Sequence, residues 1–171
     1  MKIKTEISTK RKTQLLCVFV LENSNKVLGI PKFDTKISSS INQSLKDMNG
    51  ELGKLTIIPI PDKKQAQRIL LAGIGKKQNL TQDTIRFVSG KIAQKARELK
   101  LKEFSIIAPP TFVIDSVSSV SQIIEGTKMS LYKFDKFKTE KIDKTPDMTI
   151  IVSKSNKISK TIKIAEAVAE G

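Results

Sequence analysis

Short apolar runs alternate along the chain with longer segments in which apolar residues recur every three or four positions. The short runs are typical of strands, and the recurring spacing is typical of amphipathic helices. The runs that predict strands lie at residues 15–21, 54–61, 67–73, 103–108 and 148–152, and the partial alternation of apolar and polar residues at 1–8 predicts a further strand. The continuous run at 15–21 predicts a strand buried on both faces of a sheet. Because Pro59 and Pro61 have no amide hydrogen for a sheet ladder, the strand at 54–61 is expected to lie near an edge or to end early.

Local signals mark where the first two helical segments begin or end. The first segment has apolar positions 37, 41, 45 and 48 and closes at Asn49-Gly50, a pair that favours the left-handed backbone found after helices. The second segment is expected to begin at Thr81, whose hydroxyl can accept a hydrogen bond from a first-turn amide. Asp83 then lies where a negative charge interacts favourably with the helix dipole.

Two further helices are expected after the strands at 103–108 and 148–152. One opens at Asp115 or Ser116, and the other begins at about Ser159. No internal repeat is present. Strands that alternate with helices in this way predict an α/β fold with a mixed, largely parallel sheet that helices cover on both faces.

Length and composition fit one globular domain. The chain has 171 residues, of which 39% are hydrophobic and 28% are charged, proportions far from those of disordered or collagen-like proteins. A chain of about 150 residues buries about 68–70% of the surface that its unfolded form exposes. That burial suffices for one sizeable core, so we expect residues 1–171 to form a single domain.

The chain has no histidine and one cysteine, which excludes several kinds of site. Imidazole mechanisms, an internal disulfide and a zinc module of cysteines and histidines are ruled out. In the apolar run 15–21, Cys17 is expected to be a buried small hydrophobic residue, with a reactive thiol as the alternative. That run is shorter than the roughly twenty residues that cross a bilayer, and no signal-peptide pattern precedes it. We therefore expect a soluble, cytoplasmic protein with no membrane partner.

The 31 basic and 17 acidic residues give a net charge of +14. A strong positive charge attracts nucleic acids, because lysines and arginines release counterions from phosphates. The basic residues are nevertheless spread along the chain, with small groups at Lys2, Lys4, Lys10, Arg11, Lys12, Lys63, Lys64, Lys76 and Lys77. Such scatter is typical of a solvated surface, so only weak, non-specific nucleic-acid binding is expected.

The densest charged segment, residues 132–141, alternates lysines with Tyr132, Phe134 and Phe137. Such a pattern can stack the bases of a single strand, and a helix end with core-facing rings and exposed lysines gives the same string. We expect the three rings mainly to pack, because an apolar ring gains more from burial than from exposure. A nucleotide- or nucleic-acid-binding module is the alternative function.

Two glycine-containing segments could either bind a ligand or allow a backbone conformation or a close approach that only glycine permits. Gly73-Ile74-Gly75 follows an apolar strand, where phosphate-binding turns occur. A dinucleotide fingerprint would need glycine instead of Gln78, and a P-loop would need glycine instead of Leu70. These glycines are therefore expected to let the chain leave the strand with positive φ. Glu125-Gly126 is expected to mark a close approach between a helix and a neighbouring backbone, with a catalytic carboxylate as the alternative.

No constellation for catalysis or metal binding is present in the sequence. Metal hydrolysis needs several converging carboxylates, and the acids here are mostly isolated among lysines. Serine catalysis lacks both a histidine and a G-x-S-x-G turn. The serines near the start of the third helix are expected to belong to its first turn and polar face: Ser116, Ser118, Ser119 and Ser121. We predict no catalytic, cofactor-binding or metal-binding residue in this chain.

Four stretches form a set that spans nearly the whole chain. Residues 68–76 read R-I-L-L-A-G-I-G-K, and the next helix contributes Ile85-Arg86 and Gly90-Lys91. The most distinctive stretch runs from I-I-E-G at 123–126 to L-Y-K-F-D-K-F-K at 131–138, and the chain closes on I-A-E-A-V-A-E-G. In this order and spacing the stretches resemble the N-terminal domain of the leucyl aminopeptidase family, the cytosolic two-metal exopeptidases.

The resemblance implies a fold and a function. In that family the equivalent of residues 165–171 runs directly into the catalytic domain, so this chain is expected to stop at a domain boundary. The catalytic motif N-T-D-A-E-G-R has no counterpart here. The implied fold is a three-layer α/β/α domain similar to the macro domains that bind ADP-ribose, used for assembly and active-site access. For the parent enzyme, the resemblance implies two divalent metals, zinc or manganese, peptide substrates, a hexamer and a catalytic domain as partner.

Overall fold

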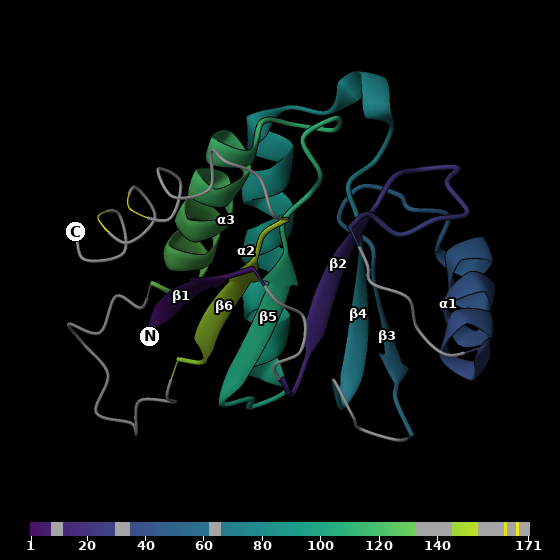
Figure 1. Cartoon of the computed structure of the whole chain (residues 1–171), viewed down its shortest axis with the longest axis horizontal. Helices are drawn as coiled ribbons and strands as arrows, with labels where there is room; N and C mark the ends of the chain where they lie inside the picture. The colour runs from purple at the N-terminus through teal and green to yellow at the C-terminus, as the bar shows by residue number, and fades with distance from the viewer. Residues whose placement is uncertain are drawn as a thin grey trace.

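The computed structural model describes residues 1–7, 12–29, 35–61, 66–132 and 145–153, together with residues 163 and 167. Within these residues the chain forms one six-stranded sheet and three α-helices (Figure 1). The strands are β1 (Ile3–Glu6), β2 (Leu16–Val20), β3 (Leu55–Pro59), β4 (Arg68–Gly73), β5 (Glu103–Ile107) and β6 (Asp147–Ile151). The helices are α1 (Thr35–Met48), α2 (Gln82–Glu98) and α3 (Ser116–Leu131), with a short 3-10 helix η1 (Lys77–Asn79) before α2.

All six predicted strands and the first three predicted helices are present, and the strand ends differ from the prediction by at most two residues. Of the helix expected from about Ser159, only Lys163 and Ala167 are among the described residues, and both are helical and exposed. The basic residues at positions 10, 11, 63 and 64 lie outside the described part of the chain.

The sheet has the strand order β1-β6-β5-β2-β4-β3. Every neighbouring pair is parallel except β3 with β4, which confirms a mixed, largely parallel sheet. β3 lies at one edge and ends at Pro59, where a missing amide hydrogen is tolerated. The edge position predicted for this strand is therefore confirmed.

Side chains of the central strand β2 alternate between two apolar clusters, one on each face of the sheet. Residues 17 and 19, together with Leu15 just before the strand, pack with residues of α2 and α3, whereas residues 16, 18 and 20 pack with residues of α1. All of β2 is buried, as its continuous apolar run predicted. Helices α2 and α3 lie side by side on one face, and α1 covers the other (Figure 1). The predicted α/β fold class is confirmed.

The two adjacent helices begin where the sequence indicated. The Thr81 hydroxyl accepts a hydrogen bond from the Thr84 amide (3.3 Å), and the Thr84 hydroxyl accepts one from the Thr81 amide (3.2 Å), a reciprocal cap of α2. Asp115 caps α3 by accepting from the Ser118 amide at 3.0 Å. Gln82 donates to the Ser118 hydroxyl at 3.2 Å, so the first turns of α2 and α3 lie against each other.

Candidate functional site

The Gly73-Ile74-Gly75 turn is held by backbone hydrogen bonds. The Gly75 amide donates to the Gly50 carbonyl at 3.1 Å, and the Gly73 amide donates to the Lys54 carbonyl at 2.9 Å. Gly75 has φ +75°, so the expected backbone role is confirmed there. Gly73 is needed for another reason, because a Cβ at this position would collide with the Glu51 carbonyl oxygen. Since both glycine amides are occupied, the turn does not offer them to a phosphate.

An open hollow of about 590 Å³ lies where β2 and β4 end. This edge of a parallel sheet is where α/β proteins commonly bind ligands. The Glu22 amide donates to the Gly75 carbonyl at 2.9 Å, which ties together the two loops that form the hollow. The lining is mainly polar and exposed: Leu21, Glu22, Asn23, Ser24, Asn25, Lys76, Lys77 and Gln78. Exposed lysines and amides do not by themselves select a ligand, and we assign none to this hollow.

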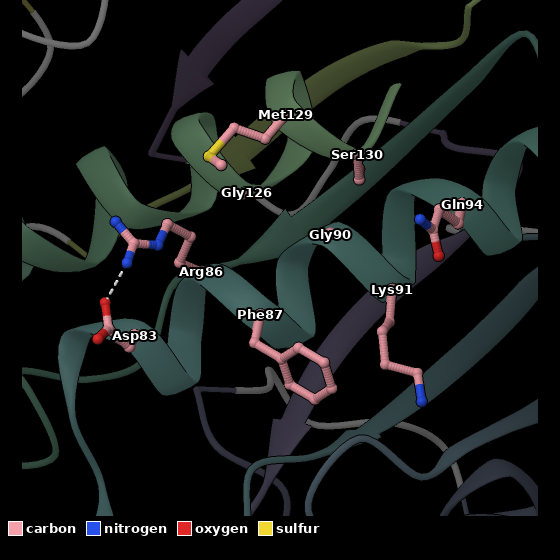
Figure 2. Close-up of a pocket in the computed structure, with 9 residues that line it drawn as sticks. All are labelled: Asp83, Arg86, Phe87, Gly90, Lys91, Gln94, Gly126, Met129 and Ser130. Carbon is pink, nitrogen blue, oxygen red and sulfur yellow. Dashed lines mark hydrogen bonds and ion pairs between the residues drawn. The ribbon is translucent and has the colours of Figure 1, made fainter. Parts of the chain in front are cut away.

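A second hollow, of about 530 Å³, runs between the outer faces of α2 and α3, and we call it the α2–α3 groove. Figure 2 shows the residues that line it, which are Asp83, Arg86, Phe87, Gly90, Lys91, Gln94, Gly126, Met129 and Ser130. Two glycines form its floor. A Cβ on Gly126 would collide with the Arg86 carbonyl oxygen, and a Cβ on Gly90 would lie 3.2 Å from the Gly126 carbonyl oxygen. The close backbone approach expected at Glu125-Gly126 is thus confirmed.

Arg86 links α2 and α3 beside the glycines that form the floor of the groove. The Arg86 guanidinium pairs with Asp83 on its own helix and with the Glu125 carboxylate on α3 at 3.4 Å. The Glu125 side chain is 43% exposed, and an exposed pair of this kind contributes about 0–1 kcal/mol to stability. The contact gives Glu125 a structural partner across the helix interface, and no described group makes it part of a catalytic constellation.

Apolar side chains remain exposed along the rim of the α2–α3 groove. Phe87 is 52% exposed and Met129 is 70% exposed. The Lys91 ammonium lies 5.6 Å from the centre of the Phe87 ring, within the range of a cation–π contact. Large exposed apolar side chains at the rim of a groove are typical of protein–protein interaction surfaces and of ligand-binding grooves. The sequence did not predict this surface, because Phe87 is not among the residues that α2 buries. Met129 lies on a different helix, and local spacing does not show that the two helices line one groove.

Ser118 and Ser119 make hydrogen bonds within and between the first turns of the helices, as the sequence predicted, although Ser119 is buried rather than on the polar face. The Ser119 hydroxyl is buried and donates to the Asp115 carbonyl at 2.9 Å, and the Ser118 hydroxyl accepts from Gln82. Cys17 is fully buried, and this burial raises the pKa of its thiol far above the usual range. A thiolate is therefore disfavoured at Cys17, which agrees with a small hydrophobic residue.

Within the described residues, no three histidine, cysteine, aspartate or glutamate side chains come together to hold a metal ion. In the same part of the chain, no helix is both long and apolar enough to cross a membrane.

The expectation that Tyr132 packs in the core is wrong. Tyr132 is 75% exposed, because α3 ends at Leu131 and the backbone turns to an extended conformation at Tyr132 (φ −60°, ψ 117°). Leu131 is buried in the core instead. Phe134, Phe137 and the rest of the segment 133–141 lie outside the described residues.

We expect nucleic-acid binding by this chain to be weak and steeply dependent on salt. The described basic residues at positions 2, 4, 12, 76 and 77 are exposed, and electrostatic attraction without base readout gives a Kd of about 10⁻⁴–10⁻⁶ M at physiological salt. Titration of unrelated duplexes and single strands at two salt concentrations measures this. A strong preference for one sequence that persists at high salt would contradict the expectation.

The comparisons with known proteins agree with this fold. The family model "Cytosol aminopeptidase family, N-terminal domain" matches residues 17–141. The probable cytosol aminopeptidase of Cenarchaeum symbiosum is 32% identical over 175 residues, which cover 100% of this chain and 34% of that protein. A probable cytosol aminopeptidase of Sulfurihydrogenibium is 26% identical and covers 93% of this chain and 33% of that protein. This chain thus spans about a third of the length of the curated relatives that it matches.

Two solved structures share the fold. A mutant of tomato leucine aminopeptidase superposes with a TM-score of 0.71 at 18% identity and covers 99% of this chain and 36% of that chain. The bottromycin maturation enzyme BotP superposes with a TM-score of 0.59 at 14% identity and covers 92% of this chain and 30% of that chain. Because the family model matches well over half of the residues, this chain belongs to the cytosol aminopeptidase family, as an N-terminal domain of that family.

Proposed function

We propose that residues 1–171 form the single N-terminal domain of a metal-dependent aminopeptidase that releases N-terminal amino acids from peptides in the cytoplasm. The observation that carries this proposal is the match of residues 17–141 to the N-terminal domain of the cytosol aminopeptidase family. The relatives named cytosol aminopeptidase are about three times as long as this chain. In the proposal, the chemistry therefore belongs to a catalytic domain outside these 171 residues.

The residues present here do not fit the metals that the family implies. The chain has no histidine, and no three described acids or cysteines converge. We therefore place two divalent ions, zinc or manganese, in the catalytic domain and derive no step through them. One solved structure of BotP is a complex with Mn, which supports manganese as one of the two candidates.

The role proposed for this domain is to bind its own catalytic domain and to take part in a homo-oligomer, with a hexamer as the assembly of the whole enzyme. The α2–α3 groove supports a role in assembly, because its rim exposes Phe87 and Met129. Large apolar side chains that stay exposed at a groove are typical of surfaces that another protein surface covers.

The purified 171-residue chain is expected to leave leucine p-nitroanilide intact in the presence of manganese, because it has no histidine and no three of the described acids and cysteines converge on a metal site. The matched sample is the full-length aminopeptidase of Cenarchaeum symbiosum, its relative at 32% identity, assayed under the same conditions and expected to hydrolyse the substrate. Turnover by the 171-residue chain that survives removal of trace contaminants would place catalysis inside this domain and overturn the proposal.

A further inference from the structure

Three residues of α2 that line the α2–α3 groove follow one another at intervals of four: Asp83, Phe87 and Lys91. At 3.6 residues per turn they lie within an arc of roughly 80°, and about 12 Å separates the first from the last along the axis. In Figure 2, Phe87 lies between Asp83 and Lys91 along the helix. An acid, a ring and a base in this order are self-complementary. When a second copy of the helix runs antiparallel to the first, its Lys91 lies opposite Asp83 and its Phe87 lies opposite Phe87.

Two other exposed apolar side chains accompany Phe87. Met129 lines the groove from α3, and Leu52 is 56% exposed. It precedes Gly53, where a Cβ would lie 3.1 Å from Cε1 of Phe87. The glycine floor at Gly90 and Gly126 leaves room for a side chain from outside. Burying these side chains against a partner supplies most of the association free energy.

The charged residues at the two ends can each take a partner. The Asp83 carboxylate accepts from Arg86, and a carboxylate has about four acceptor sites, so it can accept from a second donor. Among the described residues, Lys91 forms no ion pair and contacts the Phe87 ring. Exposed ion pairs add little affinity, but they fix the register and orientation of two surfaces.

We propose that a second copy of this chain docks on the α2–α3 groove, with the two α2 helices antiparallel about a two-fold axis at Phe87. The two Phe87 rings then pack against each other and against Met129, and each Asp83 meets the partner's Lys91. Such an interface is isologous, which is the common arrangement in homodimers. The proposal rests on the assembly role proposed for this domain and names the surface and the partner. Dimerisation of this chain is measured without any peptidase activity, so failure of the dimer and failure of the aminopeptidase function are distinguishable.

The net charge of +14 per chain opposes association at long range. At physiological ionic strength, however, the Debye length is about 8 Å, so charges far from the interface are largely screened. At short range the interface brings two Asp83 carboxylates against two Lys91 ammonium groups, and each Arg86 pairs with Asp83 and Glu125 of its own chain. Charge therefore favours the antiparallel arrangement over a parallel one, in which Asp83 would face Asp83 and Lys91 would face Lys91.

Sedimentation velocity of the 171-residue chain over a concentration series tests the proposal. We expect a reversible monomer–dimer equilibrium, and we expect Phe87→Ser to raise the dimer Kd at least about tenfold. Phe112→Ser is the matched control, because Phe112 is also an exposed phenylalanine (71%) and does not line the groove. Thermal melts followed by circular dichroism should show that both variants fold as the unmodified chain does.

A charge exchange tests the antiparallel register. Asp83→Lys alone brings two bases together at each end of the interface, and Lys91→Asp alone brings two acids together, so each variant is expected to weaken the homodimer. An equimolar mixture of the two variants restores acid against base at both ends and is expected to form heterodimers. The double variant Asp83→Lys/Lys91→Asp is expected to dimerise with itself for the same reason.

Several results would overturn the proposal. The first is a chain that stays monomeric at its highest attainable concentration, and the second is a dimer whose Kd does not change with Phe87→Ser. A mixture of the two charge variants that remains monomeric would exclude the antiparallel register. A groove covered by the catalytic domain would leave this chain monomeric, and that outcome would leave the proposed aminopeptidase function standing.

Discussion

Gly126→Ala is expected to destabilise the chain, although alanine is the better helix former. Helix propensity alone would favour the substitution by about 1 kcal/mol. A Cβ at Gly126 would collide with the Arg86 carbonyl oxygen and would lie 3.1 Å from the Arg86 Cα. Backbone atoms of a packed helix cannot move aside as the end of a flexible side chain can. We expect the free energy of unfolding to fall by about 1–3 kcal/mol, as measured by urea denaturation.

The matched control is Met129→Ala, which lies on the same helix. Met129 is 70% exposed, and surface substitutions usually change stability by less than about 0.5 kcal/mol. Both variants are measured in dilute solution, so that self-association does not contribute. If Gly126→Ala proves as stable as the unmodified chain or more so, α2 and α3 do not approach each other closely at this glycine.

Phe19→Ala is expected to cost about 3–5 kcal/mol of unfolding free energy, because it removes a buried ring from the centre of the sheet. Phe19 is 0% exposed on β2 and belongs to the apolar cluster beneath α2 and α3. Native domains have unfolding free energies of only about 5–15 kcal/mol. Calorimetry should show a melting temperature lower by roughly 6–20 °C.

Phe112→Ala provides the comparison for this second prediction. It removes the same ring from a position that is 71% exposed, and we expect the melting temperature to change by no more than about 2 °C. Equal losses in the two variants would mean that Phe19 is not in the core, and that β2 is not the central strand of the sheet.

Much of the fold could be predicted from short segments of the sequence. The apolar runs predicted the strands, and helical spacing predicted α1, α2 and α3, because each pattern reflects contacts within a few residues. Thr81 and Asp115 marked the starts of two helices through the hydrogen bonds that their side chains accept. Pro59 marked an edge strand, because it lacks an amide hydrogen.

The candidate site could be predicted only in part. The pair Glu125-Gly126 indicated a close backbone approach, because glycine inside a helix needs a packing reason. The partner of that approach, the Arg86 carbonyl on α2, and the groove above it could not be predicted. Tyr132 was misplaced because α3 ends at Leu131, so the Leu131 side chain reaches the core and the Tyr132 side chain, on the extended backbone that follows, does not.

The sequence by itself determined the elements, the α/β class and the absence of histidine chemistry, since all three follow from composition and local periodicity. The tertiary structure alone decided the strand order, in which β1 and β6 pair although they lie near opposite ends of the chain. It also decided that Gly73 serves a close approach to Glu51 rather than a positive φ. Such contacts join residues far apart in the sequence, so each depends on how the whole core packs and not on the pattern of any single segment.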